Sequence, residues 1–177
     1  VCKAEKVKLA SAEGRIIFSD IISSIDVPPH NNSAVDGFAV YHDDLNVSGS
    51  TTLPIKGRVV AGGNFVENPR RGQAIQIFTG APIPQRAKGL SPDTIFMIED
   101  VVVDGDTITL PEGQMKGANI RMAGEDVKRG DTVINCGKRL RPQDIGMLAA
   151  IGYSKVKVRA PLNCLLYTSP SPRDGLL

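Results

Sequence analysis

The central part of the chain contains the stretch Val101-Val102-Val103-Asp104-Gly105-Asp106-Thr107-Ile108-Thr109-Leu110, in which Asp-Gly-Asp joins two β-branched runs. Asp and Gly accept positive φ angles at low cost, so this arrangement is typical of a tight β-hairpin. Further strand-like segments precede it, at residues 55–61, 73–78 and 93–98, and a turn is predicted at residues 62–64. The region from Leu53 to Leu110 is therefore expected to be rich in β-strands.

The flanking regions add two predicted helices. Residues 4–13 are interpreted as a short helix that ends at Gly14, and residues 142–151, which begin Pro-Gln-Asp, as a longer one that ends at Gly152. Shorter strands are predicted at 15–25, 38–41, 131–134 and 156–158, with a loop at 27–33. The resulting fold class is α+β, with most of the structure in β-strands.

Composition excludes several classes of protein. The 177 residues include 21 Lys and Arg against 19 Asp and Glu, and only 5% are aromatic, with no Trp. A formal charge of +2 and few stacking side chains argue against a nucleic-acid partner. No apolar run approaches the length of about 18 residues that suggests a transmembrane helix, so no membrane partner is expected. Three widely spaced cysteines without a CxxC motif fit a reducing, cytoplasmic location.

The first candidate for chemistry is the loop Asn32-Ser33-Ala34-Val35-Asp36-Gly37, which leads into an apolar strand. Asp36 places a carboxylate beside a glycine, where a ligand or a backbone segment can approach closely. An Asx turn between Asp36 and its own backbone explains the same residues.

The second candidate is Phe78-Thr79-Gly80-Ala81-Pro82-Ile83-Pro84, in which two prolines rigidify the end of a strand. Such a loop can present a hydroxyl and backbone amides to an oxyanion. A plain strand-ending turn is the alternative.

The third candidate is Asn119-Ile120-Arg121-Met122-Ala123-Gly124-Glu125-Asp126. Its carboxylates suit a hard cation such as Mg²⁺, and its arginine suits a phosphate. A solvated turn with a weak surface ion pair is the alternative.

Taken in order, these motifs resemble the molybdopterin molybdenumtransferase (MoeA) family, which includes the E domain of gephyrin. Shared features are Pro28-Pro29 before the first loop, Ala61-Gly62-Gly63, Glu99-Asp100, Lys128-Arg129-Gly130-Asp131 and the segment 142–152. The resemblance covers about residues 9–162.

The resemblance implies an elongated first domain that is interrupted by a barrel-like β-rich second domain. Carried over, the first domain is residues 4–22 plus 131–160, and the inserted second domain is residues 23–130. The family's third and fourth domains have no counterpart, so the chain is expected to be an N-terminal fragment that is inactive alone. Residues 161–177 are expected to hold a truncated start of the third domain and a non-native tail, because the Ser-Pro repeat does not continue the family's strand.

The implied activity is the insertion of molybdate into adenylylated molybdopterin with release of AMP, in a cytoplasmic homodimer that uses Mg²⁺ or Zn²⁺. Asp36 and Asp126 fall on the family's cleft motifs and are the predicted catalytic residues and metal ligands. Thr79, Gly80 and Arg121 are the predicted substrate-binding residues, which hold anionic oxygens. The alternative function is a non-catalytic scaffold of the gephyrin type.

Overall fold

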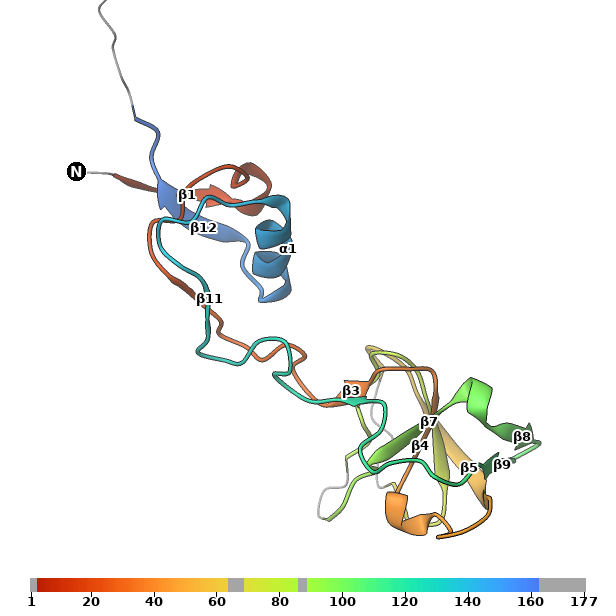
Figure 1. The fold of residues 1–177 in the computed structure, drawn as a ribbon. Helices are drawn as coiled ribbons and strands as arrows, with labels where there is room; N and C mark the ends of the chain where they lie inside the picture. The colour runs from red at the N-terminus through yellow and green to blue at the C-terminus, as the bar shows by residue number, and fades with distance from the viewer. Residues whose placement is uncertain (1–2, 64–68, 86–88, 163–177) are drawn as a thin grey trace, which may run out of the picture. The chain divides into compact units, whose positions relative to one another are not determined.

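The computed structural model describes residues 3–63, 69–85 and 89–162, and it forms two compact units (Figure 1). One unit combines the chain up to Ile21 with the chain from Ile134 onward, and the other runs from Ile22 to Val133. The continuous unit is thus inserted into the discontinuous one. No helix among the described residues is long and apolar enough to cross a membrane.

The inserted unit is built on a curled six-stranded sheet in the order β7-β4-β6-β5-β9-β8. Neighbouring strands are antiparallel except β5 and β6, which are parallel. The hairpin predicted from Asp104-Gly105-Asp106 is confirmed, because Val102 faces Thr109 and Asp104 faces Thr107. The bounds are β4 Gly37–Val40, β5 Thr51–Val59, β6 Ala74–Ile77, β7 Thr94–Met97, β8 Val102–Asp104 and β9 Thr107–Leu110.

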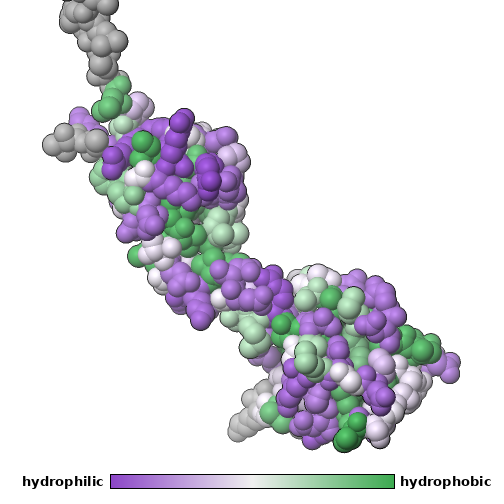
Figure 2. All heavy atoms as spheres, viewed as in Figure 1, coloured by the Kyte–Doolittle hydropathy of each residue, from purple (hydrophilic) through white to green (hydrophobic). Residues whose placement is uncertain are grey.

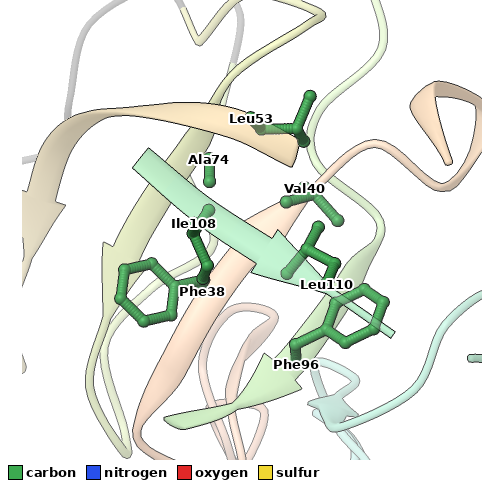
Figure 3. Close-up of a cluster of buried hydrophobic side chains, with 7 residues drawn as sticks. All are labelled: Phe38, Val40, Leu53, Ala74, Phe96, Ile108 and Leu110. Carbon is green, nitrogen blue, oxygen red and sulfur yellow. The ribbon is translucent and has the colours of Figure 1, made fainter. Parts of the chain in front are cut away.

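The central strands of this sheet are covered by apolar side chains on both faces. One face holds a cluster to which Phe38 and Phe96 contribute the largest side chains (Figure 3). Ala39 and Ile95, the alternate residues of the same strands, point to the opposite face and join a second apolar cluster. Central strands that are covered on two sides must be apolar throughout, and all four residues of β4 are buried.

The remaining pairs are short. They are β1 (Ala4–Lys8) with β12 (Lys155–Arg159), β2 (Ile21–Ile22) with β11 (Thr132–Ile134), and β3 (Asn32–Ser33) with β10 (Ile120–Arg121). Single 3₁₀ turns lie at Leu9–Ser11, His42–Asp44 and Ile98–Asp100. The predicted second helix is confirmed as α1, Pro142–Ala150.

Two predictions near the N-terminus are wrong. Residues 4–8 form strand β1 instead of a helix, because the alternation in Ala-Glu-Lys-Val-Lys turns Glu5 and Val7 inward once β12 pairs with it. The strand predicted over residues 15–25 shrinks to Ile21–Ile22, with single bridges at Ile16 and Ile17. Long-range pairing, which local propensity does not contain, decides both segments.

Helix α1 starts on a buried carboxylate. Asp144 accepts hydrogen bonds from the backbone amide of Arg141 (3.0 Å) and from Lys138 Nζ (2.7 Å), and its side chain is 8% exposed. The hydrogen bond from Lys138 contributes most to lowering the pKa of Asp144 from 3.8 to about 2, against the opposing effect of burial.

We expect this carboxylate to make folding sensitive to acid. Because the folded-state pKa is lowered, its stabilisation is present above pH 4 and lost as the pH falls from about 4 to about 2, a loss of roughly 2 kcal/mol. Chemical denaturation at pH 5 and at pH 2.5 should show a smaller loss for Asp144→Asn than for the wild type. Glu13→Gln, at an exposed position, serves as the control. Equal acid losses in wild type and Asp144→Asn would contradict the assignment.

Candidate functional site

The three candidate loops meet around strand β3 in the inserted unit. On one side, the Ser33 amide donates to the carbonyl of Ala81 (3.0 Å), and the Gly80 amide donates to the carbonyl of Ser33 (2.9 Å). On the other side, β3 pairs with β10, and the Ala34 amide donates to the carbonyl of Asn119 (2.9 Å). A two-residue strand therefore joins segments that lie 48 residues (Ser33 to Ala81) and 87 residues (Ser33 to Ile120) further along the chain.

Apolar side chains of the same loops anchor them to the sheet. Ala81 and Ile83 are buried in the cluster beneath the second face, and Val35 and Ile120 pack against it. Each loop thus contributes one or two apolar residues to the core. Asp36, Thr79 and Asp126 are exposed and Arg121 is partly exposed, so these polar groups remain accessible to solvent.

Asp36 and Thr79 form a pair across two of the loops. The Thr79 backbone amide and hydroxyl both donate to Asp36 Oδ1, each at 2.7 Å. The amide hydrogen bond contributes most to lowering the pKa of Asp36 below 3.8, and the hydroxyl adds to it. The described residues place no hydrogen-bond partner on Oδ2, which leaves one carboxylate oxygen available. Asp36 Oδ1 therefore links two loops. In an Asx turn it would instead accept a hydrogen bond from the backbone of its own loop.

The Thr79-Gly80 loop does not present free amides. The Thr79 amide is used by Asp36, the Gly80 amide by Ser33, and the Ala81 amide by the carbonyl of Phe78. The expected oxyanion role of amides near Gly80 therefore does not match these hydrogen bonds. Gly80 has a φ of +77°, a conformation that glycine adopts at low cost, so its contribution here is to the shape of the loop.

Arg121 and Asp126 form the second pair. Arg121 donates to Asp126 Oδ1 at 2.5 Å, and its Nε lies 3.5 Å from Glu125 Oε1. The hydrogen bond to Asp126 is the main cause of the raised pKa of Arg121. One cation thus faces two carboxylates, so its charge is already compensated before any anion arrives.

Asn31, which sequence reasoning did not include in the site, fixes this turn. Its Oδ1 accepts a hydrogen bond from the Ala123 amide (2.8 Å), tying the turn of the third loop to the first. Its neighbour Asn32 keeps Oδ1 buried without a hydrogen-bond partner among the described residues. An asparagine in a loop belongs to no sequence motif with a characteristic spacing. The positions of Asn31 and Asn32 depend on contacts between loops that are far apart in the sequence.

The five predicted residues do not line the cavity that lies beside the third loop. That cavity, of about 540 Å³, is lined by Ile120 and Met122, the neighbours of Arg121, and by Asp93 and Lys116. Asp36, Thr79, Gly80, Arg121 and Asp126 are absent from its walls. The loops that carry these five residues meet at β3, and their polar side chains lie outside this cavity.

The described carboxylates offer few ligands for a metal ion. Within residues 3–63, 69–85 and 89–162, no three His, Cys, Asp or Glu side chains gather where they could hold a metal ion. Zn²⁺ usually takes three or four protein ligands, which this surface does not offer. Mg²⁺ is commonly held by one or two carboxylates together with substrate phosphates and water, which Asp36 Oδ2 suits.

Comparisons with known proteins agree on one family. The chain is 41% identical over 156 residues to a molybdopterin molybdenumtransferase of Haemophilus influenzae, covering 88% of this chain and 37% of the relative. It is 34% identical over 163 residues to the protein of that name from Synechococcus elongatus, covering 89% and 39%. A crystal structure of the molybdopterin biosynthesis MoeA protein from Pyrococcus horikoshii superposes with a TM-score of 0.79 at 37% identity, covering 88% of this chain and 41% of that one.

The chain spans about two fifths of the length of these relatives. A family model described as the MoeA N-terminal region (domain I and II) matches residues 1–152. The protein therefore belongs to the MoeA family and contains its N-terminal region.

Proposed function

We propose that this chain supplies the first two domains of a molybdopterin molybdotransferase, which inserts molybdate into adenylylated molybdopterin and releases AMP. In this proposal the discontinuous unit corresponds to residues 4–22 plus 131–160, the inserted unit to 23–130, and the intact protein works as a cytoplasmic homodimer. The observation that carries the proposal is the convergence of the three family motifs on β3, which gathers their polar residues in one unit.

Charge determines what the site residues do in this proposal. The substrate carries a phosphoanhydride and the second reactant is molybdate, so two anions must approach a surface that already holds Asp36, Glu125 and Asp126. Arg121 offsets a phosphate most strongly when Asp126 releases it, because the two carboxylate contacts already compensate the charge of the guanidinium. In this proposal, substrate binding transfers Arg121 from the Asp126 carboxylate to a phosphate.

Asp36 has a different role in this proposal. The amide and the hydroxyl of Thr79 both hold Asp36 Oδ1, so the carboxylate is restricted to one orientation and Oδ2 stays available to a ligand. When bound, Mg²⁺ would supply charge compensation for the phosphates and for the carboxylate freed from Arg121. Asp36 orients a water molecule or that cation, and Thr79 positions Asp36. The lowered pKa keeps Asp36 ionised, as both roles require.

A chimera tests this function. Residues 1–162 of this chain replace the matching region of the Haemophilus relative, which supplies the rest of the enzyme, and AMP release from adenylylated molybdopterin is measured with molybdate and Mg²⁺. We expect turnover within about tenfold of the relative. A folded chimera that binds the substrate and releases no AMP would contradict the proposal and favour a non-catalytic scaffold.

A further inference from the structure

The discontinuous unit carries a basic face on its strand pair β1–β12. Side chains alternate along both strands, so that Lys6 and Lys8 on β1 and Lys155, Lys157 and Arg159 on β12 are exposed. The register puts Lys6 opposite Lys157 and Lys8 opposite Lys155. Figure 2 shows hydrophilic residues gathered over the unit that contains these strands. Five cations therefore share one face of a two-stranded ribbon.

The described structure does not compensate this charge. None of these five side chains has a hydrogen bond or ion pair with another described residue, and Glu5, on the opposite face, is bound to Arg15. Residues 3–21 and 134–162 hold ten Lys and Arg against four Asp and Glu. Like charges directly opposite one another in an antiparallel pair are destabilising. The ribbon is thus a surface whose repulsion an anion would relieve.

Strand β1 also has an edge that pairs with no other described strand. The Leu9 amide donates to the carbonyl of Ser154 (3.1 Å), and the Ala160 amide donates to the carbonyl of Lys3 (2.8 Å). In an antiparallel ladder, residues that bond to the partner alternate with residues whose N–H and C=O point away. Ala4, Lys6 and Lys8 are therefore the β1 residues with outward backbone groups, and among the described strands β1 pairs with β12 alone.

The other edge of β12 is closed. The Phe18 amide donates to the carbonyl of Lys157 (3.0 Å), and the Arg159 amide donates to the carbonyl of Ile16 (2.7 Å). Ile16 and Phe18, which pair with β12 on this side, each remain 38% exposed. A new strand can thus be added only at β1, where lysine side chains and unpaired backbone groups belong to the same residues.

We propose that the β1 edge binds an extended acidic peptide segment by strand addition. Backbone hydrogen bonds to Lys6 and Lys8 hold the segment in register, and that register places its alternate side chains directly opposite the two lysines. Asp or Glu at those positions forms cross-strand ion pairs and relieves the repulsion from Lys155 and Lys157.

Charge selects this occupant over others. Lysine on an edge strand discourages pairing with a second copy, because Lys6 and Lys8 of two basic strands would repel each other. A polyanion without a strand-forming backbone, such as a nucleic acid or a phospholipid surface, satisfies the charges and leaves the edge N–H and C=O groups unused. The combination of a free edge with lysines favours an acidic strand.

The test uses the 177-residue chain and a fluorescein-labelled peptide of four Glu-Thr repeats, followed by fluorescence anisotropy at low salt. A matched peptide carries N-methyl groups on its Glu residues, which keeps the charge and removes the backbone donors. We expect saturable binding of the first peptide, and binding at least about tenfold weaker for the methylated one.

A double variant, Lys6→Glu with Lys8→Glu, should weaken binding at least about tenfold. It should not lower the melting temperature, because Glu then faces Lys157 and Lys155. Lys56→Glu with Lys128→Glu, at exposed positions of the other unit, should change the affinity less than about twofold.

Three outcomes would overturn the proposal. Failure of the Glu-Thr peptide to bind would mean that the lysines only prevent other strands from pairing with the β1 edge. Equal binding of both peptides would show a general polyanion surface. A doubled mass in light scattering that the peptide reverses would identify a second copy as the occupant.

Discussion

Replacing Gly37 with alanine is expected to destabilise the inserted unit by at least about 3 kcal/mol. A Cβ atom at this position would lie 1.8 Å from the carbonyl oxygen of Phe96 and 2.9 Å from its carbonyl carbon. Both atoms belong to the backbone of β7, where Met97 faces Gly37. The strands would have to separate, which would break their hydrogen bonds and disturb the packing of Phe38 and Phe96.

Denaturant unfolding of the whole chain measures this effect, and Gly146→Ala is the matched control. Gly146 lies in α1, where an added Cβ would meet no atom within 4 Å, so the same substitution should stabilise by about 0.5–1 kcal/mol. Opposite signs for the two variants would support the β4–β7 pairing. A Gly37→Ala variant with the wild-type midpoint would contradict it.

The second large effect concerns catalysis, and it rests on the proposed function. In the chimera with the Haemophilus relative, Asp36→Asn should lower the rate of AMP release about 10²-fold, since the neutral amide can neither hold a cation nor orient water as a carboxylate does. Thr79→Val, which removes only the hydroxyl donor to Asp36, should have a smaller effect, about tenfold, because the amide hydrogen bond remains.

Asp100→Asn is the control for that series. Asp100 is exposed in the 3₁₀ turn after β7, and it shares a family motif with Glu99. Among the described residues, its side chain makes no hydrogen bond to the loops around β3. Its replacement should leave AMP release unchanged. Loss of activity equal to that of Asp36→Asn would mean that negative charge in general, rather than the Asp36–Thr79 pair, is required.

The sequence predicts well those elements whose signal is local. Asp104-Gly105-Asp106 specifies a hairpin by its own backbone preferences, and Pro142 with Gly152 marks the ends of α1. The segment at residues 4–8 is different, because its alternating pattern has meaning only when β12, about 150 residues later, provides a partner. A local interpretation therefore favoured a helix where the structure has a strand.

The candidate site could likewise be predicted only in part, because its contacts join distant segments. Motif resemblance selected Asp36, Thr79, Arg121 and Asp126, and no local pattern could show that Asp36 would bond to Thr79, 43 residues away. The role of Asn31 depends on a contact across 92 residues. The engaged amides of Thr79 and Gly80 were also beyond prediction, because their acceptors come from the β3 loop.

The measurement that most directly tests the account is a double-mutant cycle in the chimera, with Asp36→Asn and Asp126→Asn made singly and together. If the loops around β3 form parts of one reaction site, the two losses in AMP release are not independent, and the double variant should be little slower than the slower single variant. Losses that multiply would show that the two carboxylates act separately, which would contradict the single site proposed here.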